Sequence, residues 1–143
     1  MKNVTIYADG ACSGNPGKGG WGAVLKFGAT EKELSGFNPH TTNNQMELLG
    51  VIEALKSLKE PCEVNIYSDS KYVVQGCNEW MSAWIKNSWR TSTNKPVKNI
   101  DFWKQLQELI QFHETKFHWV KGHADNAYNN RCDELARQAI LDS

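Results

Sequence analysis

The sequence of 143 residues lacks any hydrophobic run long enough to cross a membrane. A membrane-spanning helix needs about 20 consecutive apolar residues, and the first residues alternate like a strand instead of resembling a secretory signal. We therefore expect a cytoplasmic protein with no membrane partner. Repeats, low-complexity stretches and linkers are also missing, so residues 1–143 are expected to form one domain. No predicted helix has an apolar face that demands a partner, which favours a monomer.

Cysteines are few and widely scattered. The four residues form no CxxC pair and no Cys/His spacing typical of a zinc site; they are Cys12, Cys62, Cys77 and Cys132. This usage indicates ordinary reduced thiols, which fits a cytosolic protein and argues against a structural zinc.

Net charge is also absent, because 16 basic residues balance 16 acidic ones. The charge is unevenly placed, however. Residues 80–104 contain five basic side chains and one acidic side chain, which makes this segment +4 and the remainder −4. A local basic patch can bind phosphate while acids elsewhere hold a metal ion, so the asymmetry is more informative than the total.

Periodicity and turn residues predict an α/β fold. Alternating patterns predict strands at 4–9, 21–27, 32–37, 64–69 and 115–120, with loops at 10–20 and 87–99. Helical spacing predicts helices from Thr41 or Thr42 to Pro61, over 70–85, from a cap at Asp101 to His113, and over 132–140. The order βββ-α-β-α-α-β-α implies a mixed five-stranded sheet flanked by helices.

Two of these strands end almost identically, in Ile6-Tyr7-Ala8-Asp9 and Ile66-Tyr67-Ser68-Asp69. If the two strands are parallel neighbours, both carboxylates emerge at one end of the sheet. Two anions at close range repel unless one is protonated or a cation lies between them. The pattern therefore suggests a divalent-metal site, although either Asp could also simply begin a turn or cap a helix.

Two further acids could complete such a site. Glu47 lies near the start of the first helix, just before its apolar stripe, and Asp133 follows the first apolar position of the last helix. Each alone could equally be a solvated acid in a first helical turn. Together with Asp9 and Asp69 they could hold two hard cations, since Mg²⁺ prefers oxygen ligands. Two ions about 4 Å apart would activate a water and stabilise the leaving oxygen of a phosphodiester.

At this point the residues match a family. The chain resembles the bacterial type 1 ribonucleases H in the ordered segments YADG (7–10) with GNPG (14–17), TTNNQMEL (41–48), YSDS (67–70), WVKGHA (119–124) and NRCDELA (130–136). The resemblance implies a ribonuclease H-like fold and an endonuclease that cuts the RNA strand of RNA–DNA hybrids, leaving 5′-phosphate and 3′-hydroxyl ends. It also implies Mg²⁺ as the cofactor, with Mn²⁺ as an alternative and two ions present with substrate.

The resemblance assigns roles to individual residues. The family's four metal-binding acids correspond to Asp9, Glu47, Asp69 and Asp133, and its mobile histidine, implicated in proton transfer or product release, corresponds to His123. A histidine suits proton transfer because its pKa lies near neutrality.

Substrate contacts are implied in the same way. Discrimination of RNA requires groups that hydrogen-bond a 2′-hydroxyl. The positions that correspond to these contacts are Cys12, Asn15, Asn43 and Asn44, with the backbone of Gly10 nearby. The turn and the helix start could also account for these asparagines. A phosphate pocket for the DNA strand corresponds to Thr42 and Asn99, with His40 where an arginine is common, and Lys71 replaces a frequent Gln beside Asp69.

The basic segment corresponds to the family's protruding handle. Aromatic and basic residues interleave there, and Trp80, Lys86 and Arg90 are candidate substrate contacts. Trp80 and Trp84 lie four residues apart, so packing between helices is an alternative role for both. Because Asn87 and Ser88 stand where basic residues often occur, we expect weaker hybrid binding with an ordinary catalytic step.

Two other functions remain open at this stage. One is a hybrid-binding module without catalysis, which would need a broken set of acids. The other is a DNA nuclease or strand-transfer enzyme of the same fold, against which the asparagine cluster counts. Cleavage assays on hybrid and on duplex DNA distinguish these alternatives.

Overall fold

A computed structural model describes residues 1–122 and 126–143. Within these residues, five strands form one mixed sheet in the order β3-β2-β1-β4-β5. The strands are β1 (Lys2–Ser13), β2 (Gly17–Phe27), β3 (Thr30–Thr41), β4 (Cys62–Ser68) and β5 (Glu114–Trp119). The first three pair antiparallel as consecutive hairpins, whereas β1–β4 and β4–β5 are parallel. The predicted α/β class and the mixed sheet are confirmed.

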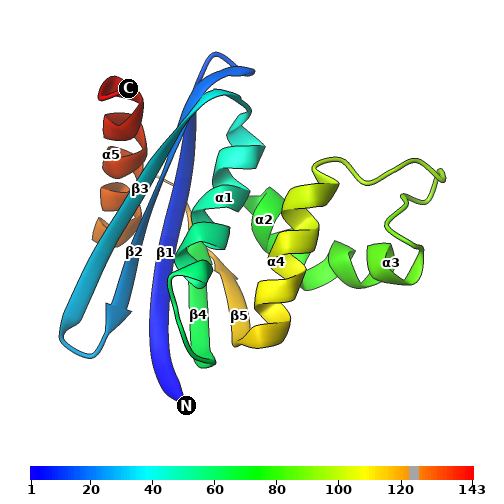
Figure 1. Ribbon diagram of the computed structural model, residues 1–143, viewed down its shortest axis with the longest axis horizontal. Coiled ribbons are helices and arrows are strands. Elements are labelled where there is room, and N and C mark those ends of the chain that lie inside the picture. The colour runs from blue at the N-terminus through cyan, green and yellow to red at the C-terminus, as the bar shows by residue number, and fades with distance from the viewer. Residues whose placement is uncertain (123–125) are drawn as a thin grey trace.

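Helices cover both faces of the sheet. In chain order they are α1 (Asn43–Lys56), α2 (Lys71–Gln75), the π-helical segment η1 (Gly76–Trp80), α3 (Met81–Lys86), α4 (Ile100–Phe112) and α5 (Ala127–Leu141). Figure 1 shows α5 on one side of the sheet and α1, α2 and α4 on the other. The α2–η1–α3 segments run without a break and correspond to the single helix predicted at 70–85.

The first helix begins as its sequence predicts. The Thr42 side chain accepts a hydrogen bond of 3.2 Å from the backbone N–H of Gln45, which satisfies one of the free donors at the start of α1. Leu48, Ile52 and Leu55 then lie on the sheet side of the helix and are fully buried. Each such burial stabilises the fold by roughly 1.5–3 kcal/mol, so α1 is anchored by its apolar face.

The two matching strand ends lie side by side. Ile6 pairs with Ile66 and Tyr7 with Tyr67 in the parallel register of β1 and β4. Both isoleucines are fully buried, and the two tyrosine rings stack with centroids 5.2 Å apart. The predicted adjacency of the two Asp-terminated strands is thereby confirmed.

The glycine-rich segment was predicted wrongly as a loop over 10–20. Strand β1 continues to Ser13 and β2 begins at Gly17, so only a short turn separates them. Gly20 and Gly22 lie in β2 where α5 packs directly on the backbone: a Cβ at Gly20 would lie 2.2 Å from the Ala136 carbonyl oxygen, and one at Gly22 would lie 2.4 Å from the Cys132 carbonyl oxygen. Close helix packing, and not backbone flexibility, is the reason for these two glycines. Conformational freedom is needed at Gly14 in the turn, where φ is 77°.

Two further helix details differ from expectation. The cap of α4 is Asn99, at φ 60°, and Asp101 lies in the first turn instead. The segment after Gly76 widens into the π-helical turn η1, and the indole of Trp103 from α4 packs where a Gly76 Cβ would be.

The predicted handle projects from the body of the molecule. In Figure 1, α3 and the chain that follows it extend away from the sheet before α4 returns. In the part of the chain that the structure describes, no helix combines the length and apolar character needed to cross a membrane.

Candidate metal centre and substrate groove

Three of the four predicted acids meet at one end of the sheet. Asp9 lies in β1 opposite Gly22, Asp69 directly follows β4, and Glu47 reaches in from α1. One carboxylate oxygen from each lies within 4.8 Å of the others, a separation at which one cation can contact all three. Asp9 and Glu47 are buried and Asp69 is half-buried. The predicted meeting of both strand-end carboxylates is therefore found.

Gly10 lets helix and strand approach each other at this site. Its backbone N–H donates to Oε1 of Glu47 and, at 2.9 Å, to Oδ1 of Asp9. A Cβ at Gly10 would lie 2.5 Å from the backbone nitrogen of Glu47, which is closer than any side chain allows. Gly10 thus has a structural role at the acids, whatever contact it makes with substrate.

The electrostatics of the cluster favour a cation. The pKa of Asp9 is raised to about 7, mainly by burial and with a smaller contribution from the neighbouring charge of Asp69. Burial also raises the pKa of Glu47 well above its ordinary value, with the charge of Asp9 as the next cause. Among the described residues, no lysine or arginine forms an ion pair with these three carboxylates. Oxygen donors alone, close together and unpaired, fit a hard divalent ion such as Mg²⁺.

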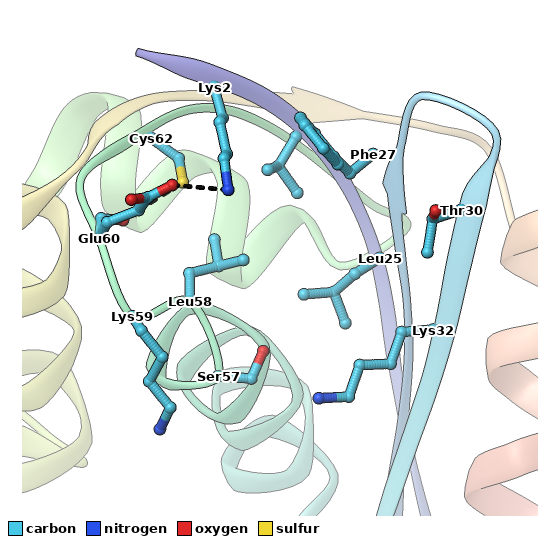
Figure 2. Close-up of a pocket in the computed structure, with 11 residues that line it drawn as sticks. Lys2, Leu25, Phe27, Thr30, Lys32, Ser57, Leu58, Lys59, Glu60 and Cys62 are labelled. Carbon is cyan, nitrogen blue, oxygen red and sulfur yellow. Dashed lines mark hydrogen bonds and ion pairs between the residues drawn. The ribbon is translucent and has the colours of Figure 1, made fainter.

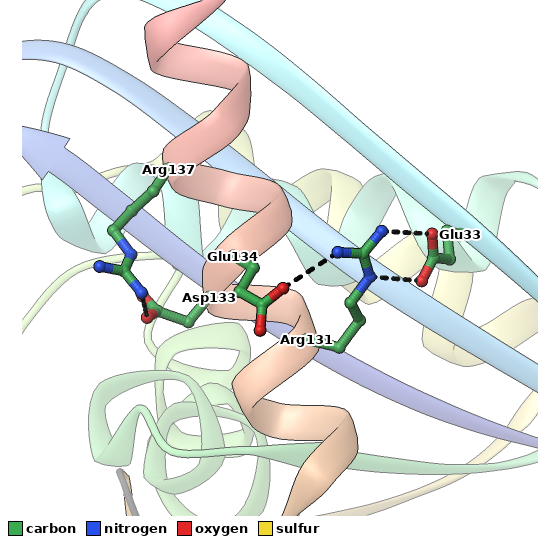
Figure 3. Close-up of polar contacts among 5 residues, drawn as sticks. All are labelled: Glu33, Arg131, Asp133, Glu134 and Arg137. Atoms are coloured by element: carbon green, nitrogen blue, oxygen red, sulfur yellow. Dashed lines mark hydrogen bonds and ion pairs between the residues drawn. The ribbon is translucent and has the colours of Figure 1, made fainter.

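Asp133 lines the same groove but stands apart from the cluster. Its residue is half-buried on α5, and it shares the groove with Asp9, Glu47 and Asp69. The described residues that hold ligand atoms within 4.8 Å of one another include only the first three acids. Oδ2 of Asp133 instead lies 2.8 Å from Nη2 of Arg137, one turn along the helix (Figure 3). The fourth predicted ligand is therefore near the site and engaged elsewhere.

His123 lies outside the described residues. Gly122, immediately before it, approaches the acids closely, since a Cβ there would lie 2.8 Å from Oδ2 of Asp69. The described chain thus passes beside the acidic cluster just before the predicted histidine.

A tryptophan beside Asp69 was missed by sequence reasoning. The indole N–H of Trp119 donates a 3.0 Å hydrogen bond to the backbone carbonyl of Asp69, which holds the bend after β4. The Lys71 ammonium lies 4.9 Å from the centre of the same indole ring. Lys71 also lines the groove, so the predicted substrate contact is placed beside the acids. The sequence signals for Trp119 were its position at the end of a predicted strand and its place at the start of the WVKGHA segment (119–124).

Most of the predicted sugar and phosphate contacts gather around the start of α1. Oδ1 of Asn15 accepts a 3.1 Å hydrogen bond from the backbone N–H of Asn43. The side chains of Asn43 and Asn44 are exposed and line the groove that contains the acids. Cys12 lies next to them, with its thiol 3.4 Å from the Thr41 carbonyl oxygen.

The two residues predicted to bind a DNA phosphate are connected through Gln45, which the sequence analysis did not single out. The backbone N–H of Gln45 donates a hydrogen bond to the capping side chain of Thr42. The side-chain amide of Gln45 donates a second hydrogen bond, of 3.2 Å, to Oδ1 of Asn99. Nδ2 of Asn99 in turn donates 3.1 Å to the Tyr72 hydroxyl. Gln45 thereby connects Thr42 at the start of α1 with Asn99 before α4.

The tryptophans of the handle pack onto the body of the molecule. The Trp84 ring lies 5.2 Å from the buried Trp103 ring and 6.0 Å from that of Trp80. The alternative that Trp84 packs one helix onto the next is confirmed, because Trp103 lies in α4. The rings beside Trp80 belong to Tyr72 and Trp84 in the same continuous stretch, and Trp80 keeps 37% of its surface exposed. Lys86 and Arg90 are exposed beyond them, and Arg90 donates to the Asn94 carbonyl at 3.3 Å.

A second cavity lies at the opposite end of the sheet. Its volume is about 480 Å³. Figure 2 shows Leu25, Phe27 and Leu58 among the apolar side chains that line it, together with Lys2 and Glu60, which form an ion pair of 2.8 Å. None of the clustered acids lines it. The carboxyl ends of parallel strands are the usual place for chemistry in such sheets, and this cavity lies at the other end.

Comparisons with known proteins agree with the geometry. The family model "RNase H" matches residues 1–141. The chain is 62% identical to a ribonuclease H of Chlorobium phaeobacteroides (strain BS1), covering 98% of this chain and 97% of that protein. Among solved structures it is similar to LC9-RNase H1, described as a type 1 RNase H with the type 2 active-site motif, at a TM-score of 0.90 and 28% identity over 99% of this chain and 74% of that one.

A second structural match concerns the fold alone. LC11-RNase H1, crystallised in complex with an RNA/DNA hybrid, is 23% identical with a TM-score of 0.75, and the match covers 97% of each chain.

Proposed function

Because this chain belongs to the ribonuclease H family, and is an enzyme of that family, we propose that it hydrolyses the RNA strand of RNA–DNA hybrids at the acidic cluster, leaving 5′-phosphate and 3′-hydroxyl ends. The observation that carries the proposal is the group of Asp9, Glu47 and Asp69, whose carboxylate oxygens lie within 4.8 Å of one another in an open groove. A groove of this kind admits a phosphodiester beside ligands for a hard cation.

The metal is proposed to be Mg²⁺, with Mn²⁺ as an alternative. Asp9, Glu47, Asp69 and Asp133 would supply the metal ligands, and two ions are proposed to be present with substrate. When bound, the ions supply an activated water and stabilise the charge on the leaving oxygen. The chain's own part is to place the carboxylates: Gly10 donates to two of them, and Trp119 fixes the bend that carries Asp69.

His123 is proposed to move a proton at the leaving oxygen or to assist product release. The support is its position in the sequence, one residue after Gly122, whose backbone lies beside Asp69. A histidine that titrates near neutral pH suits either task.

Selection of the hybrid is assigned to the asparagines at the start of α1. Asn43 and Asn44 are exposed in the groove, and an amide can both donate to and accept from a 2′-hydroxyl. Cys12, Asn15 and the Gly10 backbone lie next to them, and Thr42 with Asn99 would receive a phosphate of the DNA strand. A protein of the same fold, LC11-RNase H1, was crystallised with such a hybrid.

Three attributes stay predictions from the sequence: that residues 1–143 act as one catalytic domain, that the chain works as a monomer, and that it resides in the cytoplasm.

The proposal is tested with end-labelled duplexes of one sequence. We expect Mg²⁺-dependent cutting of the RNA strand in an RNA–DNA hybrid, and no cutting of single-stranded RNA or duplex DNA. The product ends are read by their sensitivity to phosphatase and their ability to be ligated. Equal cutting of duplex DNA would show that the protein is a DNA nuclease, and binding without any cutting would show a hybrid-binding module.

A further inference from the structure

Asp133 differs from the other three acids in having a cationic partner. Nη2 of Arg137 lies 2.8 Å from its Oδ2, in an i,i+4 pair on α5 (Figure 3). Asp9, Glu47 and Asp69 have no lysine or arginine partner among the described residues. The site therefore contains three available carboxylates and one that is already engaged.

We propose that Arg137 is a positioning residue that competes with metal for Asp133 and thereby lowers the affinity of the free enzyme for divalent cations. The inference rests on the proposed function, because it requires the acidic cluster to bind metal. It adds a residue that sets how firmly the cation is held before substrate arrives.

The competition follows from the geometry of the pair. A carboxylate oxygen at 2.8 Å from a guanidinium nitrogen is accepting a charge-assisted hydrogen bond, so a cation must displace the guanidinium or share the oxygen with it. The guanidinium also carries a positive charge next to the groove, and like charges repel an incoming divalent ion. Both effects act in the same direction.

The effect is expected to be moderate, because the pair is not buried. The Arg137 side chain is 64% exposed and that of Asp133 is 23% exposed, and exposed i,i+4 pairs are weak. Arg137 would thus weaken the metal site without preventing its use, and substrate phosphate could displace it further.

The same helix provides a matched control. Arg131 is exposed to a similar degree and pairs with Glu33 on β3 at 2.6 and 2.9 Å and with Glu134 at 3.1 Å, as Figure 3 shows. Its replacement removes one positive charge from α5 and two ion pairs, with Glu33 and Glu134, without touching a predicted metal ligand. Any effect of Arg137 that Arg131 shares is therefore general electrostatics.

The test is a Mg²⁺ titration of the full chain without nucleic acid. Binding is measured by titration calorimetry and by the rise in melting temperature with Mg²⁺. Arg137→Gln is expected to bind Mg²⁺ about two- to fivefold more tightly than the wild type. Arg137→Lys, which keeps the charge but loses the planar fork, should fall between the two, and Arg131→Gln should match the wild type.

A double-mutant cycle shows whether Arg137 acts through Asp133. In an Asp133→Asn background, Arg137→Gln should produce at most a small further change. An unchanged affinity in Arg137→Gln, or the same gain in Arg131→Gln or in the Asp133→Asn background, would overturn the proposal. If the wild type itself shows no Mg²⁺ binding, the proposed metal site fails as well; if it binds normally and Arg137→Gln is equal to it, only the inference about Arg137 fails.

Discussion

At the scale of single residues, the fold holds the carboxyl groups of Asp9, Glu47 and Asp69 close together although their negative charges repel one another. Asp9 and Glu47 are buried and close to each other, so the metal-free protein must protonate them or accept their repulsion. The pKa of Asp9 near 7 means that the folded protein holds this proton far more tightly than the unfolded chain does. Stability of the metal-free protein therefore falls as pH rises from about 4 to 7.

Asp9→Asn is expected to raise the stability of the metal-free protein while abolishing turnover. The asparagine keeps an oxygen that can accept the Gly10 N–H but carries no charge. The gain should be about 1–3 kcal/mol at pH 8 and should shrink toward pH 5, where the wild-type carboxyl is already protonated. Denaturant unfolding in chelator at both pH values measures it.

Asp101→Asn is the control for that experiment, since Asp101 is an exposed acid on α4 away from the cluster. It should produce no gain that grows with pH. A metal-free Asp9→Asn protein no more stable than the wild type at pH 8 would show that repulsion at the site is unimportant.

At the scale of helices and strands, the sequence predicted the order of elements and the parallel pairing of the two Asp-terminated strands. Local patterns sufficed there, because period-2 alternation and helical spacing are properties of neighbouring residues. The extent of β1 and β2 could not be predicted, since Gly20 and Gly22 are required by the packing of α5, more than 100 residues away in the sequence. Two side-chain contacts likewise depend on the folded arrangement and could not be predicted: the hydrogen bond from Trp119 to Asp69 and the ion pair between Asp133 and Arg137.

Gly76→Ala should destabilise the protein, although alanine is ordinarily favoured over glycine in a helix by about 1 kcal/mol. Gly76 has an ordinary helical φ of −57°, so it gains nothing from its conformational freedom. A Cβ there would lie 2.1 Å from Cη2 of Trp103, a fully buried ring with no room to move. Overpacking of this kind costs about 1–3 kcal/mol, so after the gain in helix propensity the net loss in unfolding free energy should be up to about 2 kcal/mol.

Gly50→Ala is the matched comparison. Gly50 is buried in α1, but the nearest atom to its added Cβ, the Asp9 carbonyl oxygen, is 3.4 Å away. Helix propensity should decide there, and the variant should be neutral or more stable. Equal effects of the two substitutions on the denaturation midpoint would rule out the contact with Trp103 as the cause.

At the scale of the whole molecule, opposite charges occupy different regions. The acidic groove lies at the end of the sheet, and the segment 80–104, with a net charge of +4, includes the part of the chain that projects from the body (Figure 1). A nucleic acid attracted by the handle can be held while the acids keep the cations that its phosphates require.

Replacing both Lys86 and Arg90 by Ala should raise KM and reduce the dependence of KM on salt, with kcat little changed. Each lost phosphate contact lowers the salt slope by about 1, so the slope should fall by at most about 2. Steady-state cleavage of a hybrid at several salt concentrations measures both. Alanines at Lys56 and Lys116, which are exposed outside the handle, control for the change in net charge. A fall in kcat alone would instead assign Lys86 and Arg90 to the chemical step.

The packing of α5 on Gly20 and Gly22 of β2 helps to determine where a predicted metal ligand lies. Asp133 follows Cys132, the residue whose carbonyl rests 2.4 Å from where a Gly22 side chain would begin. Any side chain at Gly20 or Gly22 would lift the helix and move that carboxylate with it. These two glycines are therefore poor positions for stabilising substitutions. A natural variant with a side chain at either position is expected to lose activity.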